Sequence, residues 1–120
     1  ADLDGDGDVD LFVVNSVGFK NELLLNDGQG SFTAVASGAT AVRMDKSVGA
    51  VAADLDMDGD LDLFVLNGRN TEEESTLPPP VKNDIHELLL NEGQADFTAV
   101  ASGAAVARSE SSRGAVAADL

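Results

Sequence analysis

The stretch Asp2-Leu3-Asp4-Gly5-Asp6-Gly7-Asp8-Val9-Asp10 occurs twice in this chain. Its second copy is Asp54-Leu55-Asp56-Met57-Asp58-Gly59-Asp60-Leu61-Asp62, so the displacement is 54 − 2 = 52 residues. Both copies read D-x-D-x-D-G-x-x-D and run directly into an apolar segment, 11–15 in the first copy and 63–67 in the second. Five aspartates in nine residues repel one another unless a cation lies between them. The repeated stretch therefore predicts two cation sites.

Calcium suits such a loop, because it is a hard ion that takes about six to eight oxygen ligands in flexible geometry. Carboxylates at loop positions 1, 3 and 5 can converge on one ion, and glycine at position 6 allows a sharp turn. Position 7 offers its backbone carbonyl, and a carboxylate at position 9 closes the shell. The predicted side-chain ligands are Asp2, Asp4, Asp6 and Asp10 in loop one and Asp54, Asp56, Asp58 and Asp62 in loop two, and Asp8 and Asp60 are predicted to contribute backbone oxygen.

Other readings of the acidic loops fit less well. A solvated acidic turn is common, but two copies at a fixed spacing disfavour it. An EF-hand needs a bidentate glutamate at loop position 12 and a helix on either side. That position is Val13 or Val65, within a β-type run. The spacing, without paired glycines, also differs from a glycine-rich nonapeptide array.

The charge balance restricts the partners. The chain has 7 Lys and Arg against 22 Asp and Glu, a net charge of −15, which argues against nucleic acid and anionic membrane surfaces. Two calcium ions would change this to −15 + 4 = −11, which suits a secreted protein, extracellular or at the cell surface. There is no cysteine and no apolar run long enough to cross a bilayer, so we expect no disulfide and no membrane insertion. The chain starts at Ala1 rather than Met, so we expect a processed protein or a fragment.

The chain consists of two unequal copies of one unit. Residues 1–15 match 53–67 at an offset of 52, and residues 21–55 match 86–120 at an offset of 65. The difference, 65 − 52 = 13 residues, is an insertion near 68–84. The predicted units are therefore 1–52 and 53–117, and 118–120 begins a third.

Each unit contains four predicted strands, and no stretch has a helical period with caps. The first strand is an almost continuous apolar run, typical of burial on both faces. An Asn/Asp/Gly hairpin signal separates the second strand from the third, and the fourth strand is rich in Gly and Ala. The predicted strands are about 11–15, 21–26, 31–36 and 47–53 in the first unit and about 63–67, 86–91, 96–101 and 112–118 in the second.

Four-stranded antiparallel units that recur about every 50 residues predict an all-β fold of the β-propeller type with two blades. Two blades cannot close a ring, because propellers need about four to eight. Blade one lacks its own Gly/Ala strand in this sequence. We therefore expect a fragment, a permuted unit or a window of a longer array, or separate chains that complete each other's blades. An isolated monomer should expose strand edges and be poorly stable.

Two segments carry a family resemblance. They are residues 49–65, which contain the second acidic loop, and the run Asn-x-Leu-Leu-Leu-Asn-x-Gly-x-x-x-Phe-Thr at 21–33. Through them the chain resembles the FG-GAP/VCBS-type calcium-binding repeats, which build β-propellers in integrin α-subunits and in many secreted bacterial proteins. The resemblance covers nearly all of the chain except 68–84. It implies one calcium in the loop between the inner strand and the next strand of each blade.

Catalysis is not expected. Acidic Asp-x-Asp-Gly loops also occur in phosphatases and phosphohexomutases, so metal-dependent phosphoryl transfer is one alternative. Those sites need a nearby Lys or Arg, and none of the seven cationic residues lies within either acidic loop. His86 is the only histidine and takes the place of Asn21, so we expect it on the surface at a strand edge.

The function that the sequence favours is a calcium-stabilised structural module outside the cell. Its expected partners are copies of itself or neighbouring repeats, joined head to tail into a ring or a fibre. The alternative is an adhesion or ligand-binding propeller fragment that recognises a protein or a glycan through the loop 68–84. Three prolines in this loop favour an extended chain, but an insertion without a role fits the same residues.

Overall fold

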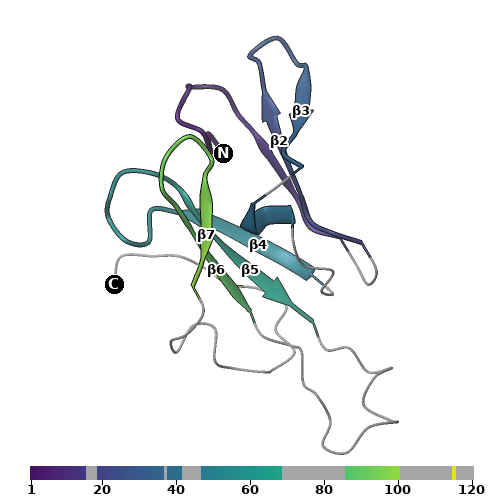
Figure 1. Ribbon diagram of the computed structural model, residues 1–120, viewed down its shortest axis with the longest axis vertical. Coiled ribbons are helices and arrows are strands. Elements are labelled where there is room, and N and C mark those ends of the chain that lie inside the picture. The colour runs from purple at the N-terminus through teal and green to yellow at the C-terminus, as the bar shows by residue number, and fades with distance from the viewer. Residues whose placement is uncertain (16–18, 37, 42–46, 69–85, 101–114, 116–120) are drawn as a thin grey trace, which may run out of the picture.

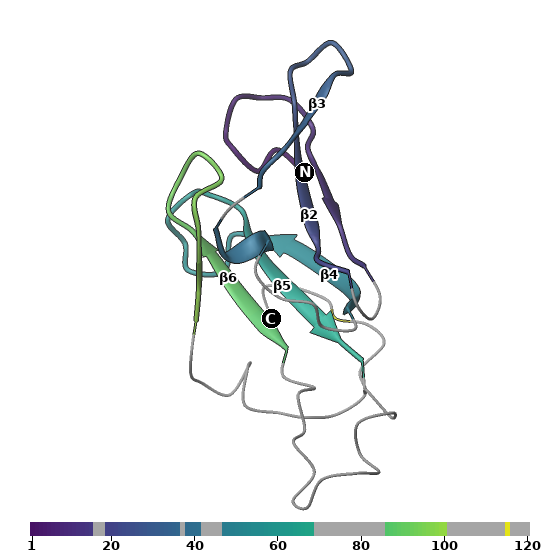
Figure 2. The same ribbon diagram turned by 45° about the vertical axis from the view of Figure 1, so that its right-hand side comes forward.

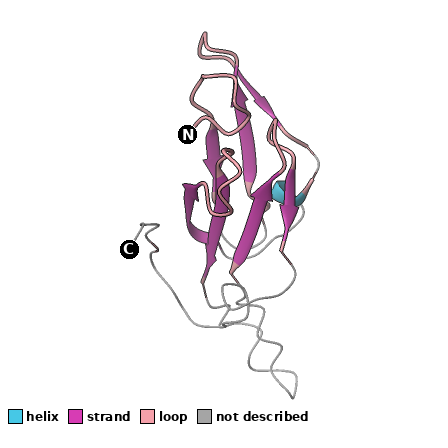
Figure 3. Cartoon of the chain, turned by 90° about the vertical axis from the view of Figure 1, so that its left-hand side faces the viewer, coloured by secondary structure: helices cyan, strands magenta, loops and turns pink. Residues whose placement is uncertain are grey.

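The chain folds into two antiparallel β-sheets, as a computed structural model describes for residues 1–15, 19–36, 38–41, 47–68, 86–100 and 115 (Figure 1). The first sheet has the order β1-β2-β3 and the second the order β4-β5-β6-β7. The predicted all-β fold with two antiparallel blades is confirmed, and the sheets form no closed ring within these residues. Figure 3 shows the strands together with a short helical turn. The elements are β1 (Leu11–Val13), β2 (Glu22–Asn26), β3 (Phe32–Ala34), the 3-10 turn η1 (Ala39–Ala41), β4 (Ser47–Ala53), β5 (Asp62–Asn67), β6 (Glu87–Asn91) and β7 (Phe97–Ala99).

The sheets and the sequence units are offset by one strand. Strand β4 ends the first sequence unit, but it pairs with β5 and so belongs to the second sheet. The first sheet therefore has three strands in the described part of the chain, and the second has four. The sequence predicts a first blade without its own Gly/Ala strand, and in the described residues β1 pairs only with β2. Within those residues, the predicted four strands are seen in the second sheet.

The two sheets share one register, so the sequence repeat is also a structural repeat. Leu24 pairs with Ala34 in the first sheet, and the equivalent Leu89 pairs with Ala99 in the second. Phe12 likewise pairs with Leu23, as their equivalents pair in the second sheet. Residues can therefore be compared one by one between the two units.

The predicted strands are found, although most are shorter than predicted, and β4 has the predicted bounds. Strand β1 ends at Val13, where its pairing with β2 ends, whereas the equivalent β5 continues to Asn67 because β4 also pairs with it. Beyond β1, the amide of Asn15 donates to the side-chain oxygen of Asn21 over 2.9 Å. The predicted strand 112–118, except residue 115, and the insert 68–84, except residue 68, lie outside the described residues. In the described ranges, no helix has the length and apolar character needed to span a membrane.

The core lies between the two sheets. Leu23 of β2 packs with side chains of the second sheet, and Leu3 of the first acidic loop belongs to the same buried cluster. The turn η1 contacts both β2 and β7, which places it between the sheets (Figure 2). Each such burial contributes about 1.5–3 kcal/mol, so the contact between sheets is a main source of stability. The buried residues from the second sheet are Leu63, Val65, Leu89 and Phe97.

Candidate metal sites

Each acidic loop is organised by hydrogen bonds from its own backbone to its carboxylates, and three of these bonds occur in both copies. Loop one has one more, from the amide of Gly5 to Asp2 over 2.8 Å. The carboxylate at position 1 accepts from the N–H at position 6, that at position 3 from position 5, and that at position 5 from position 7. The donor–acceptor distances lie between 2.8 and 3.2 Å in both loops. These bonds hold the carboxylates on the inside of a tight turn. The accepting residues are Asp2, Asp4 and Asp6 in loop one and Asp54, Asp56 and Asp58 in loop two.

The aspartate at position 9 ties its loop to the neighbouring hairpin. Asp10 is buried; its Oδ2 accepts from the amide of Leu3 over 2.7 Å and its Oδ1 from the amide of Asn26 over 2.9 Å. Asp62 makes the same two bonds in loop two at the same distances. The amides of Asn26 and Asn91 lie at the ends of β2 and β6. Loop one is therefore attached to β1 by the chain and to β2 by this hydrogen bond, and loop two to β5 and β6 in the same way.

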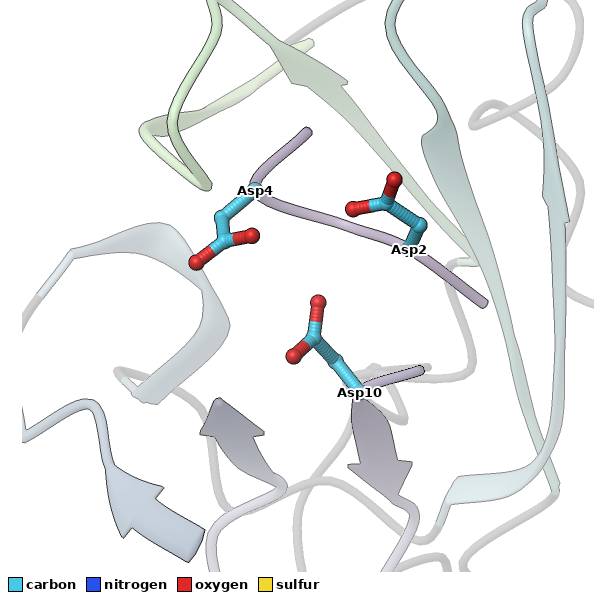
Figure 4. A group of neighbouring side chains, drawn as sticks. All are labelled: Asp2, Asp4 and Asp10. Atoms are coloured by element: carbon cyan, nitrogen blue, oxygen red, sulfur yellow. The ribbon is translucent and has the colours of Figure 1, made fainter. Parts of the chain in front are cut away.

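Three carboxylates converge in each loop. In loop one they belong to Asp2, Asp4 and Asp10, each of which offers an oxygen within 4.8 Å of the others. Figure 4 shows these three side chains directed toward a common centre. Oxygens on opposite sides of a calcium ion are about 5 Å apart, twice the Ca–O distance. The spacing and the all-oxygen donor set therefore fit calcium. In loop two the converging residues are Asp54, Asp56 and Asp58.

The predicted ligands at positions 1 and 3 are thus brought together in both loops. Asp6 in loop one and Asp62 in loop two do not join the converging oxygens, although each was predicted as a ligand and lies in the same turn. Asp62 is held by its two backbone hydrogen bonds, and Asp6 by the bond to the amide of Asp8. Their role as ligands stays a prediction.

The side chains at position 7 point elsewhere. A Cβ on Gly28 would collide with the carboxylate of Asp8, and a Cβ on Gly93 would lie 3.4 Å from Oδ2 of Asp60. Each of these carboxylates therefore lies against the glycine of the adjacent hairpin. The contribution of a backbone oxygen by position 7 stays a prediction.

Electrostatics within the loops are unfavourable without a cation. Desolvation raises the pKa of Asp4, the hydrogen bond from the Asp6 amide opposes it, and repulsion from Asp10 and Asp6 adds to it. Asp56 has a raised pKa for the same reasons in its own loop. A bound cation would relieve this repulsion. Loop one also borders an open hollow of ≈ 400 Å³ lined by Asp4, Gly5, Asp6 and Gln94.

The sequence interpretation missed one residue type at the loops. Asn26 and Asn91 were treated only as hairpin signals, yet their side-chain amides hold the loops. Asn26 Nδ2 donates to the carbonyl of Val9 over 3.1 Å, and Asn91 Nδ2 donates to that of Leu61 over 3.1 Å. The signal was available, since an asparagine follows Leu-Leu-Leu in both units.

The prediction for His86 is wrong, because the residue is buried. Its Nδ1 accepts from the amide of Asn67 over 3.1 Å, and its ring lies edge-on to Phe64 at 5.8 Å. The imidazole takes over the acceptor role that the Asn21 side chain has toward Asn15 in the first unit. It closes the end of a strand pair, which explains its burial.

Comparison with known proteins gives one match. A family model described as an FG-GAP-like repeat matches residues 2–65. The comparisons with curated proteins and with solved structures found no match. The matched residues include both acidic loops and all strands from β1 to β4.

Proposed function

From the premise that this chain belongs to the FG-GAP-like repeat family, we propose that it is a calcium-stabilised, non-catalytic module that works outside the cell and assembles with copies of itself. Its two antiparallel sheets are a propeller-type fragment. The observation that carries the proposal is the pair of acidic loops with three equivalent hydrogen bonds and three converging carboxylates each. A structural role fits two equivalent sites in a repeat better than catalysis does.

Calcium would act at the junctions between strands. Each loop precedes the first strand of a unit, and its position-9 aspartate is bonded to the end of the next strand. An ion held by positions 1 and 3 would fix the rest of the loop relative to that anchor and neutralise the repulsion within the turn. Binding therefore stabilises the folded sheets by mass action, because the unfolded chain offers no preformed site.

Two observations support an extracellular place and self-assembly. The net charge of −15 suits a medium in which calcium is abundant enough to occupy both loops. Strand β1 is paired only with β2 in the described residues, whereas the equivalent β5 lies between β4 and β6. A further strand that joined the first sheet at this edge would take the place that β4 has beside β5. The alternative, ligand recognition by loop 68–84, concerns residues that, except residue 68, lie outside the described part of the chain.

Isothermal titration of calcium into the metal-free chain tests the proposal. We expect two sites, and the double substitution Asp4→Asn with Asp56→Asn should weaken binding at least about tenfold per site, a loss of about 1.4 kcal/mol. Asp8→Asn with Asp60→Asn is the matched control, since these side chains lie against the hairpin glycines, and it should retain both sites. The absence of calcium binding, or equal losses in the two double variants, would contradict the assignment.

A further inference from the structure

The contact between the two sheets joins different faces of equivalent sheets. Residues that pair across antiparallel strands point to the same face, so Phe12 and Leu23 share one face of the first sheet. Leu63 and Leu89 share one face of the second sheet, and the equivalents of Phe12 and Leu23 lie on its other face. Leu23 and Leu89 belong to one buried cluster, with Phe12 packed against it. The internal interface therefore pairs unlike faces and has a direction along the chain.

Large apolar residues that are buried in the internal interface have more exposed counterparts in the other unit, although the register is identical. The large apolar members show this, with the exposed fraction of each side chain: Leu3 2% and Leu55 42%, Phe97 5% and Phe32 43%, Leu63 2% and Leu11 45%.

The chain thus carries two unused halves of the interface that it already forms once. We call the first the Leu24 face, which consists of Leu11, Leu24 and Phe32 on the first sheet. The second is the Leu88 face, which consists of Leu55 with Leu88 and Leu90. Leu24 and Leu88 are only half-buried, whereas their equivalents Leu89 and Leu23 are buried. The Leu24 face corresponds to the face of the second sheet that is buried in the internal interface, which contains Leu63, Leu89 and Phe97. The Leu88 face corresponds to the buried face of the first unit, which contains Leu3 and Leu23.

A hydrogen bond makes the match more specific. Asn91 Nδ2 donates to Leu61 O in its own unit and, over 2.8 Å, to Leu3 O across the internal interface. Asn26 Nδ2 makes only the bond within its own unit, to Val9 O, in the part of the chain that the structure describes. The second N–H of the Asn26 amide thus corresponds to the N–H with which Asn91 donates to Leu3 across the internal interface. By the repeat, the matching acceptor is the carbonyl of Leu55.

We propose that the Leu24 face of one copy of this chain docks on the Leu88 face of a second copy and reproduces the internal interface. Leu55 of one copy then takes the place of Leu3, and Phe32 of the other takes the place of Phe97. This inference rests on the proposed function, since it names the partner for assembly. Glu22 lies on the Leu24 face, and its equivalent Glu87 is already buried, so a carboxylate is tolerated there. Unlike faces make a ring if the rotation closes and a filament if it does not.

The test measures mass by sedimentation velocity in millimolar calcium over a range of chain concentrations. The wild-type chain should form species heavier than the 12.3 kDa monomer. Leu55→Gln and Phe32→Gln each block one face with a neutral side chain that leaves the loop charge unchanged. Each variant alone should associate at least about tenfold more weakly, because the buried amide lacks partners. Phe19→Gln, which changes another exposed phenylalanine, is the control and should associate like wild type.

Mixing the two blocked variants gives the decisive result. The Leu55→Gln chain retains an intact Leu24 face and the Phe32→Gln chain an intact Leu88 face, so the mixture should form a 1:1 dimer and nothing larger. A mixture that stays monomeric, or a wild-type chain that is monomeric at every concentration, would overturn the proposal. Calcium titration of the same samples separates the two failures. Monomers that bind two calcium ions leave the metal proposal standing, and assembly without calcium binding would refute the metal proposal alone.

Discussion

At the scale of single residues, Met57 is the clearest difference between the two acidic loops. It has a φ of 67°, where loop one has Gly5 with a φ of 79°, and its side chain is exposed. A residue with a side chain costs about 1–2 kcal/mol in the left-handed conformation. Glycine avoids this strain, but it loses about 0.5–1 kcal/mol more conformational entropy on folding. We expect Met57→Gly to raise the free energy of unfolding by about 0.5–1 kcal/mol, measured by urea denaturation.

Two substitutions check the cause. Met57→Ala removes the same exposed side chain but keeps the strained φ, so it should give no gain. Gly5→Ala introduces the strain into loop one and should destabilise the chain by about 1 kcal/mol. If Met57→Ala stabilises as much as Met57→Gly, backbone strain is not the reason.

Asp27 gives the first hairpin a defined pH dependence. Hydrogen bonds from the amides of Gln29 and then Ser31 lower the pKa of Asp27 below 3.8. The folded state therefore favours the charged carboxylate, and the resulting stability is complete above pH 3.8 and is lost as the pH falls through the lowered pKa. We expect the difference in unfolding free energy between wild type and Asp27→Asn to shrink in that window. A difference that stays constant across the acid range would contradict this.

The residue types that converge in the acidic loops could be predicted from sequence, but not all of their contacts. Alternating aspartates in a short turn converge for local reasons, so Asp2 and Asp4 were accessible to prediction. The bond from Asn91 to the carbonyl of Leu3 joins residues 88 positions apart. Such a contact depends on how the sheets pack, about which the loop spacing carries no information. His86 was misplaced for the same reason, since its burial depends on the strand pair that it closes.

At the scale of elements, the position-9 aspartates hold each loop on its hairpin. Asp62→Asn replaces one of two acceptor oxygens by an amide N–H, so one buried backbone donor loses its partner at a cost of about 1–3 kcal/mol. We expect a loss of this size in the free energy of unfolding, measured in chelator so that calcium plays no part. Asp58→Asn is the matched control in the same loop, because its exposed side chain retains the oxygen that accepts from Asp60. An equal loss in both variants would show that only loop charge matters.

The strands themselves follow from local sequence, and their ends do not. Apolar runs and Asn/Gly turns indicate where the strands lie, and the shared pattern of both units predicts the shared register. Strand β1 ends at Val13, whereas the equivalent β5 continues to Asn67 because β4 pairs along it. The length of a strand therefore depends on which neighbouring strands the packing supplies, so a pattern of apolar residues cannot reveal it.

At the scale of the whole molecule, the sequence predicts the units but not which sheet each strand joins. Strand β4 belongs to the first unit along the chain and to the second sheet in space. One consequence is that the acidic loop 54–62 connects two neighbouring strands of the same sheet. Loop one precedes β1 and packs through Leu3 against the other sheet. Calcium in loop one would therefore stabilise the contact between sheets, and calcium in loop two the second sheet itself.

Removing calcium should consequently weaken both the contact between the sheets and the second sheet itself. With a Kd of about 10–100 µM, millimolar calcium stabilises the fold by about 1–3 kcal/mol per site, and two sites should raise the melting temperature by about 10 °C or more. We expect calorimetry to show this drop on addition of chelator. Magnesium should restore little of it, because it demands octahedral geometry and retains its waters. The Asp4→Asn, Asp56→Asn double variant should show a clearly smaller shift at the same calcium concentration, because its weakened sites are less fully occupied. Wild-type melting that chelator leaves unchanged would mean that the carboxylates hold their loops without an ion, through the backbone hydrogen bonds that they accept.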